Sequence, residues 1–242
     1  MAGRAEPINV QALIFDIFGT VVDWRSSLIE DFTAWSTTRG ISGDWTGLVD
    51  AWRQAYVPSM DDVRKNPGRG FIKLDDLHRR SLEQLAPQFG LTDLTEDDLR
   101  YITTGWHRLK PWPDSVAGLT RLKTKYIISP LSNGNVGLLT RMAKNAGLPW
   151  DLILGGDVFG HYKPDPQTYL GAARLLNLPP EQVMMVAAHN NDLDAAQKLG
   201  LKTAFVPRVT EYGPLQKIDF DATGDWDVVA DDFGALADRL GC

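Results

Sequence analysis

Five short runs of consecutive apolar residues stand out along the chain. They cover 12–15, 126–128, 152–154, 183–186 and 203–206, and a weaker run follows at 228–230. Uninterrupted apolar runs of this length are typical of the buried strands of a parallel sheet. Stretches with helical spacing separate them, at 135–147, 166–176 and 190–200, and a last helix is expected from Asp232. This alternation predicts an α/β fold, with a Rossmann-like parallel sheet and helices on both of its faces.

Residues 22–110 carry a different pattern, in which helical spacing replaces the strand signals. Helices are expected at 28–38, 46–56, 74–87 and 95–108, with breaks at Pro58, Pro67-Gly68 and Pro87. Five of the eight tryptophans fall in this stretch, so it has enough bulky apolar surface to pack on itself and over the sheet. We therefore expect a core of residues 1–21 and 111–242 and an inserted helical domain of residues 22–110.

The composition narrows the class of protein. The 242 residues include 31 acidic and 25 basic side chains, and the basic residues form no block that could bind the phosphates of a nucleic acid. Nucleic-acid binding is therefore disfavoured. The single cysteine, Cys242, excludes an intramolecular disulfide and a multi-cysteine metal site. No apolar run is long enough to span a membrane, and residues 1–10 lack the apolar segment of a signal peptide. We expect a soluble cytoplasmic protein.

Polar residues follow four of the predicted strands. They are, in chain order, Asp16 with Thr20, Ser132 with Asn133, Lys163 with Tyr169, and His189 with Asn190 and Asp192. Each group has an ordinary explanation when taken alone, namely a turn, a helix cap or a solvated loop lysine. The carboxyl ends of parallel strands meet at one edge of the sheet, however, and open α/β sheets bind ligands there. The shared position therefore favours a single functional site.

These residues and their order resemble the haloacid dehalogenase-like hydrolase superfamily. Its four motifs match Asp16-Ile17-Phe18-Gly19-Thr20, Ser132-Asn133, Lys163-Pro164 and Asp192, and the resemblance covers residues 11–240, with a helical cap inserted after the first motif. Phosphatases of the superfamily have a second aspartate, their general acid, where this chain has Phe18. An aromatic residue there is similar to the (S)-2-haloacid dehalogenases. The segment Ala51-Trp52-Arg53-Gln54 also resembles a dehalogenase segment whose arginine faces the leaving halide.

The resemblance implies a two-step covalent mechanism without metal or cofactor. Asp16 would attack the halogen-bearing carbon of a small 2-haloalkanoate, and water would hydrolyse the aspartyl ester to a 2-hydroxy acid with inversion at carbon. The remaining roles that it implies are orientation of Asp16 by Thr20 and Lys163, halide binding by Arg53 and Asn133, carboxylate binding by Ser132 and the backbone after Phe18, support by Tyr169, and placement of the water by Asp192. Asn190 is a further candidate for substrate binding.

One segment departs from the better-known dehalogenases, which have Ser-x-Asn before the last motif where this chain has Ala187-Ala188-His189. A neutral imidazole can accept a proton from water, so we expect His189 to act as the base with Asp192 as its orienting partner. The alternative is that His189 only lines the halide side of the pocket.

Two other functions stay open at this point. One is a metal-dependent phosphatase of the same superfamily, and the other is a non-catalytic protein that keeps the fold. The expected ligands are a small 2-haloacid and its halide, and a homodimer is an option because related dehalogenases often dimerise. The natural substrate and the preferred halide, fluoride included, are not determined by the sequence.

Overall fold

The computed structural model describes residues 9–242, so most of the segment inspected for a signal peptide lies outside the described residues. Six parallel strands form the main sheet in the order β5-β4-β1-β6-β7-β8. Their bounds are β1 (Ala12–Phe15), β4 (Ile127–Ser132), β5 (Leu154–Gly155), β6 (Val183–Ala187), β7 (Lys202–Phe205) and β8 (Val228–Val229). The prediction of an α/β fold with a parallel sheet is confirmed.

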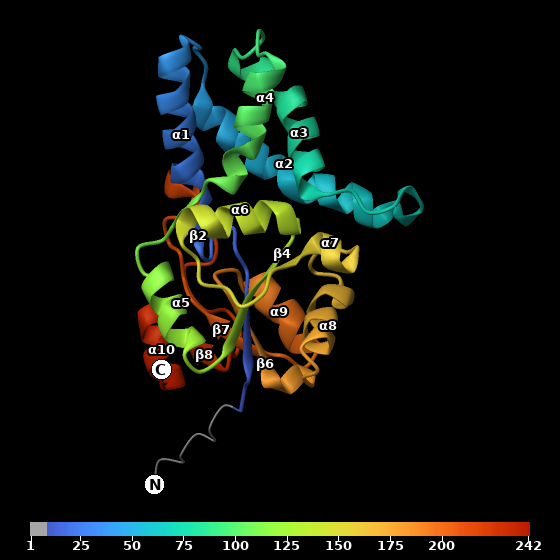
Figure 1. Ribbon diagram of the computed structural model, residues 1–242, viewed down its shortest axis with the longest axis vertical. Helices are drawn as coiled ribbons and strands as arrows, with labels where there is room; N and C mark the ends of the chain where they lie inside the picture. Colours follow the sequence, from blue (N-terminus) through green and yellow to red (C-terminus); the bar gives the residue numbers. More distant parts are fainter. Residues whose placement is uncertain (1–8) are drawn as a thin grey trace.

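Helices cover both faces of this sheet (Figure 1). The helices of the core are α5 (Ser115–Lys123), α6 (Val136–Ala146), α7 (Gly156–Phe159), α8 (Pro166–Leu175), α9 (Asn190–Lys198) and α10 (Phe233–Leu240), with short 3-10 turns η4 (Pro180–Gln182) and η5 (Gly213–Leu215). Helices α5 and α10 lie on one side of the strands and α8 and α9 on the other. Strand β1 is central, between β4 and β6, so its carboxyl end lies in the middle of the sheet edge.

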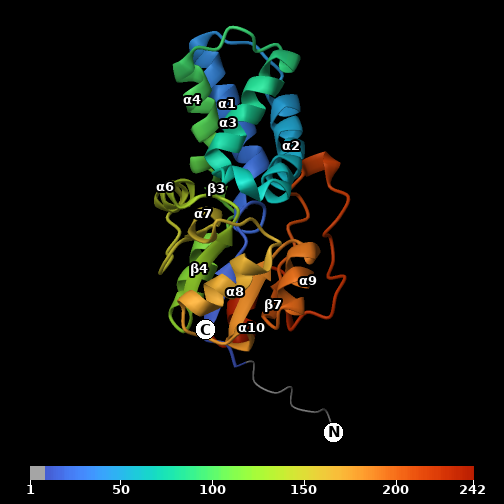
Figure 2. The same cartoon turned by 90° about the vertical axis from the view of Figure 1, so that its right-hand side faces the viewer.

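A helical unit stands above this edge (Figure 2). It consists of α1 (Trp24–Arg39), α2 (Trp45–Lys65), η1 (Pro67–Arg69), α3 (Leu74–Leu85), η2 (Ala86–Phe89), α4 (Glu96–Thr103) and η3 (Thr104–His107). Two short antiparallel strands, β2 (Val22–Asp23) and β3 (Lys110–Pro111), pair where the chain enters and leaves this unit. We call this helical unit the cap. The domain boundaries expected near residues 22 and 110 stay a prediction.

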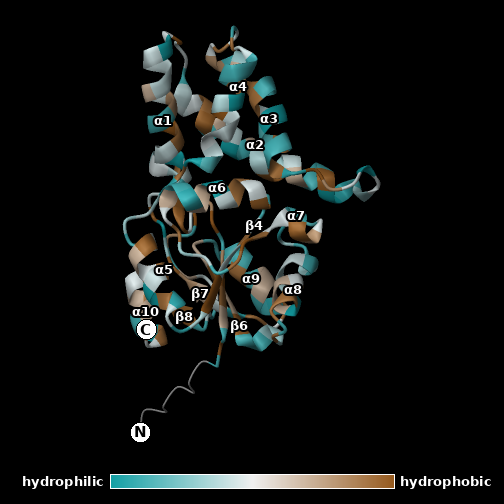
Figure 3. Cartoon of the chain, in the orientation of Figure 1, coloured by the Kyte–Doolittle hydropathy of each residue, from teal (hydrophilic) through white to brown (hydrophobic). Residues whose placement is uncertain are grey.

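The packing of β1 explains why its sequence is an unbroken apolar run. Leu13 and Phe15 belong to the large hydrophobic cluster that extends into the cap, whereas Ala12 and Ile14 belong to a second cluster on the opposite face of the sheet. All four side chains are fully buried. Figure 3 shows the consequence, because the strands at the centre are hydrophobic while much of the outer helix surface is hydrophilic. No helix among residues 9–242 is long and apolar enough to cross a membrane.

Several element boundaries differ from the expectation. Pro58 does not break the second cap helix, because it lies on the exposed face of α2, while Tyr56 and Met60 on either side are buried and anchor the helix. Strand β4 continues to Ser132 although its expected run ended at residue 128, since Pro130 still pairs with β1. Helix α5 lacks a strong apolar period and was not expected.

Candidate active site

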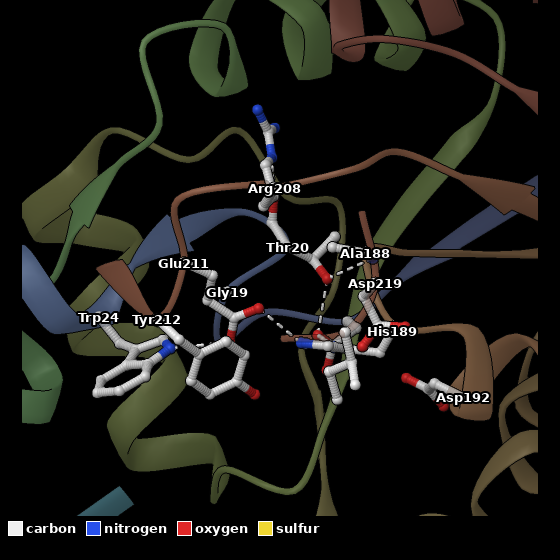
Figure 4. Close-up of polar contacts among 12 residues, drawn as sticks. Gly19, Thr20, Trp24, Ala188, His189, Asp192, Arg208, Glu211, Tyr212 and Asp219 are labelled. Carbon is white, nitrogen blue, oxygen red and sulfur yellow. Dashed lines mark hydrogen bonds and ion pairs between the residues drawn. The ribbon is translucent and has the colours of Figure 1, made fainter. Parts of the chain in front are cut away.

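Asp16 follows the central strand directly and is 7% exposed. The Thr20 hydroxyl donates to its Oδ2 at 2.8 Å and accepts the backbone N–H of Ala188 at 2.9 Å, which ties the turn after β1 to the end of β6. Figure 4 shows the bond between Thr20 and Ala188. Arg208 donates to the carbonyl of Thr20 at 3.0 Å and pairs with Asp114, so the turn is fixed from a second side. The nucleophile candidate is therefore held rigidly.

Lys163 lies between two carboxylates. Its Nζ donates to Asp16 Oδ1 at 2.9 Å and to Asp192 Oδ2, and Tyr169 donates to Asp192 Oδ1 at 2.5 Å. Burial alone would raise the pKa of Asp16, but Lys163 and then His189 outweigh it, so the pKa of Asp16 lies well below its usual range. Burial would likewise lower the pKa of Lys163, and the two carboxylates raise it instead. Both groups are ionised at neutral pH.

His189 bridges two carboxylates as well. Its Nδ1 lies 3.1 Å from Asp16 Oδ2 and its Nε2 lies 2.8 Å from Glu211 Oε2. Burial opposes the charged form, but Glu211 and Asp16 raise the pKa of His189 well above its usual value. The expected pairing with Asp192 is wrong: in the described part of the chain no hydrogen bond joins them, because the two ring nitrogens of His189 face Asp16 and Glu211 instead.

Glu211 is the functional residue that the sequence did not reveal. It lies in the irregular segment between β7 and β8, beyond the residues that directly follow β7, and its side chain is 1% exposed. Trp24 of the cap donates to Oε1 at 2.9 Å, and Figure 4 shows this carboxylate between Trp24 and His189. Gly19 adjoins it so closely that a Cβ there would lie 2.2 Å from the Glu211 carboxyl carbon. The one available signal was a glutamate in a loop that follows a sheet strand.

The cap places Arg53 over the site from α2. Its guanidinium lies 4.5 Å from the centre of the Tyr56 ring, 3.5 Å from the Tyr212 hydroxyl and 3.8 Å from Glu211 Oε1. Aromatic faces hold the cation without using all of its N–H donors, so donors remain for an anion. Phe18 packs edge-on against Trp106 and Tyr56, at centroid distances of 5.6 and 6.1 Å. Position 18, where the phosphatases described above have their second aspartate, thus carries an aromatic ring that packs against the cap.

The loop after β4 contributes through Asn133, whose Oδ1 accepts the backbone N–H of Lys163 at 2.7 Å. Ser132 is buried, and its hydroxyl accepts the N–H of Gly134 at 3.1 Å. Asn190 is used differently from the expectation. Its amide donates to Asp219 and accepts from Trp226, so a direct substrate contact would have to break bonds that hold the segment after β7.

These residues surround a cavity of about 1290 Å³ between the cap and the carboxyl edge of the sheet. Its lining includes most of the candidate residues, namely Asp16, Phe18, Arg53, Asn133, Lys163, Tyr169, His189, Asn190 and Asp192. Ser132 and Thr20 lie behind this surface. The segment between β7 and β8 rises beside α2 (Figure 2), and several of its residues line the cavity. The arrangement places the Asp16 carboxylate, the Arg53 guanidinium and the His189 ring on the wall of one cavity.

Comparisons with known proteins agree with the site. The family of haloacid dehalogenase-like hydrolases matches residues 10–200. A crystal structure of an L-2-haloacid dehalogenase is 55% identical with a TM-score of 0.92, covering 96% of this chain and 99% of its own. That of a defluorinating L-2-haloacid dehalogenase is 47% identical with a TM-score of 0.92, covering 96% of each chain.

More distant relatives are of two kinds. The (S)-2-haloacid dehalogenase of Xanthobacter autotrophicus is 28% identical over 207 residues, which is 84% of this chain and 77% of the relative. The phosphoglycolate phosphatase of Aquifex aeolicus (strain VF5) is 34% identical over 199 residues, 81% of this chain and 84% of the relative. The relatives therefore leave both cleavage of a carbon–halogen bond and hydrolysis of a phosphate ester open, and the residues around Asp16 are the evidence that distinguishes them.

Proposed function

Since the chain belongs to the haloacid dehalogenase-like hydrolase family, we propose that it removes halide from small (S)-2-haloalkanoic acids and releases (R)-2-hydroxy acids. The observation that carries this proposal is the ionised Asp16 beside the aromatic ring of Phe18, with the Arg53 guanidinium in the same cavity. The two solved structures of about half-identical sequence, both L-2-haloacid dehalogenases, support the same reaction. The substrate is a small anion, and the second product is halide.

In the first step Asp16 attacks the halogen-bearing carbon, and an aspartyl ester forms as the carbon–halogen bond breaks. A carboxylate that is 7% exposed meets the substrate with little water to displace, and Lys163 keeps it ionised. Thr20 holds one carboxylate oxygen and so limits its rotation. Arg53 and Asn133 receive the departing halide on the opposite side of the carbon, and inversion follows from this in-line geometry.

In the second step water attacks the carboxyl carbon of the ester, which restores Asp16 and frees the hydroxy acid. His189 is the base for this step, because its Nδ1 lies 3.1 Å from Asp16 Oδ2 and so adjoins the carboxyl group whose carbon the water attacks. Asp192 acts indirectly. Its two oxygens bind Lys163 and Tyr169, so it holds the lysine in place instead of activating the water.

A metal-dependent phosphatase is the main competing function, because phosphoglycolate phosphatases are among the relatives. Phosphoryl transfer needs a cation to neutralise charge beside the nucleophile and a general acid for the leaving oxygen. Here Lys163 already bridges Asp16 and Asp192, and Phe18 offers neither a ligand nor a proton. Among residues 9–242 no group of three or more potential metal-ligating His, Cys, Asp or Glu side chains is found.

Halide release tests the proposal. The protein is incubated in EDTA with (S)- and (R)-2-chloropropionate, and with fluoroacetate because one similar structure belongs to a defluorinating enzyme. We expect chloride from the (S)-acid alone, loss of activity in Asp16→Asn, and normal activity in Asp238→Asn, whose exposed carboxylate pairs with Arg121 on the surface. Absence of halide release together with Mg²⁺-dependent release of phosphate from phosphoglycolate would refute the dehalogenase.

A further inference from the structure

The base of the second step is charged in the resting site. Both ring nitrogens of His189 face carboxylate oxygens, Nδ1 toward Asp16 and Nε2 toward Glu211. A neutral imidazole has one N–H and can donate to only one of them, whereas the imidazolium donates to both. The geometry therefore requires a proton on each nitrogen, and such a ring cannot accept a proton from water.

Formation of the ester removes the negative charge from one of these two acceptors. When the Asp16 carboxylate becomes an ester it loses its negative charge, while Glu211 keeps its own. The other charged side chains near the ring do not change: Lys163 and Asp192 remain paired with each other, and Arg53 remains beside Glu211. Because an adjacent opposite charge favours the charged form of a group, its loss favours the neutral histidine.

We propose that esterification of Asp16 discharges His189, so that one proton leaves the site with the halide and the histidine becomes a base only for the second step. This inference rests on the proposed dehalogenase function. The first step forms the bond between Asp16 and carbon and breaks the carbon–halogen bond, whose electron pair leaves as halide. The proton on Nδ1 of His189 then passes to solvent, so the net loss from the site is one hydrogen halide.

The second step restores the proton. Water gives one proton to Nδ1 of His189 and its hydroxide to the carboxyl carbon of the ester. When the bond to the alkyl oxygen breaks, the remaining proton of the attacking hydroxide moves to that oxygen and gives the alcohol. Asp16 is again a carboxylate and His189 again an imidazolium. One turnover thus consumes one water and releases one proton and one halide, as the overall hydrolysis demands.

Glu211 decides which nitrogen becomes the base. It accepts from Nε2 at 2.8 Å and stays charged throughout, so the proton that remains on neutral His189 is the one on Nε2. The free lone pair then lies on Nδ1, which faces the ester. Glu211 is therefore a positioning residue, and its contact with Trp24 fixes its own orientation.

The ¹⁵N chemical shifts of the histidine rings test this without substrate. Asp16→Asn replaces the carboxylate by a neutral group of the same shape and stands in for the ester. At pH 7.5 we expect His189 to be an imidazolium in the wild type and to become mostly neutral, with its proton on Nε2, in Asp16→Asn. The signals of His107 and His161, which pair with other carboxylates, serve as internal controls. A neutral His189 in the wild type, or an imidazolium retained in Asp16→Asn, would overturn the inference.

A single-turnover experiment tests the same proposal by kinetics. It does not depend on the folding of Asp16→Asn. Enzyme in excess is mixed with (S)-2-bromopropionate in weak buffer with a pH indicator, and bromide and protons are followed together. In His189→Gln we expect one bromide per site without the matching proton, while the ester accumulates in mass spectra. A proton released in step with bromide in His189→Gln would contradict the proposal. Failure to release bromide in the wild type would instead refute the dehalogenase function.

Discussion

Replacing Gly19 by alanine should expel the Glu211 carboxylate from its place beside His189. Gly19 has φ +91°, a conformation that side chains rarely adopt, and an added Cβ would lie 2.2 Å from both the carboxyl carbon and Oε1 of Glu211. The main chain at position 19 cannot shift easily, because its N–H donates to the carbonyl oxygen of Val22 and its own carbonyl oxygen accepts the indole N–H of Trp112. The Glu211 side chain must move instead.

The cost has two parts that can be separated. The left-handed backbone costs an alanine roughly 1–2 kcal/mol. Displacing Glu211 breaks its hydrogen bond from Trp24, worth about 0.5–1.5 kcal/mol, and its charged bond from His189, worth about 1.5–3 kcal/mol. Gly90 isolates the first part, because it has φ +79° and nothing within 4 Å of an added Cβ. We therefore expect Gly19→Ala to lower the free energy of unfolding by about 2–4.5 kcal/mol more than Gly90→Ala does.

Urea denaturation measures the stability difference, and rapid-quench mass spectrometry measures the aspartyl ester. Without Glu211, His189 loses the partner that fixes its tautomer, so the second step should slow by about tenfold or more, an increase of ~1.4 kcal/mol in its barrier. Gly90→Ala should hydrolyse the ester at the normal rate. Equal destabilisation in the two variants, with an unchanged hydrolysis rate in Gly19→Ala, would show that Glu211 neither packs against Gly19 nor positions the base.

Two further substitutions test the buried network and the cap. Tyr169→Phe removes the hydroxyl that donates to Asp192, so urea denaturation should show a loss of about 1.5–3 kcal/mol, and halide release should slow. His78 is buried, neither of its ring nitrogens has a hydrogen-bond partner among residues 9–242, and its pKa is lowered to about 3 by burial. Its folded pKa lies below the unfolded value of 6.5, so stability is full above pH 6.5 and falls as the pH drops toward 3. His78→Phe should therefore remove about 2 kcal/mol of the loss between pH 7 and pH 5, and a pH-independent difference from the wild type would contradict this.

The sheet and the polar residues at its strand ends could be predicted from the sequence for one physical reason. Parallel strands buried on both faces must be apolar throughout, so each strand and its end are visible, and polar residues at those ends are brought together by topology alone. Asp16, Lys163 and Asp192 were found in this way, and they do lie in contact. The prediction needed no knowledge of side-chain geometry, because strand order places these residues at one edge.

Glu211 could not be found by the same rule, because its position depends on tertiary contacts. The irregular segment that carries it has no period, and side chains distant in the sequence determine its path. Near the start of the segment Arg208 pairs with Asp114, and further along Asp219 accepts a hydrogen bond from the Asn190 amide. The pairing of His189 with Asp192 was wrong for a related reason: both belong to one strand-end motif, but closeness in sequence does not decide which way each side chain points.

The proposed order of proton release determines the net charge of the site at each step. Six oppositely charged side chains pair with one another in the resting site, three acidic and three basic, and they are Asp16, Asp192, Glu211, Lys163, Arg53 and His189. An anionic substrate brings the total to −1, and formation of the ester leaves it there because the charge lost by Asp16 appears on the halide. If halide alone departed, the total would return to zero and His189 would stay protonated and unable to act. Departure of the proton with the halide keeps the total at −1 until the hydroxy acid leaves. The negative charge that remains, which is that of the bound substrate carboxylate, favours transfer of a proton from the attacking water to His189 in the second step.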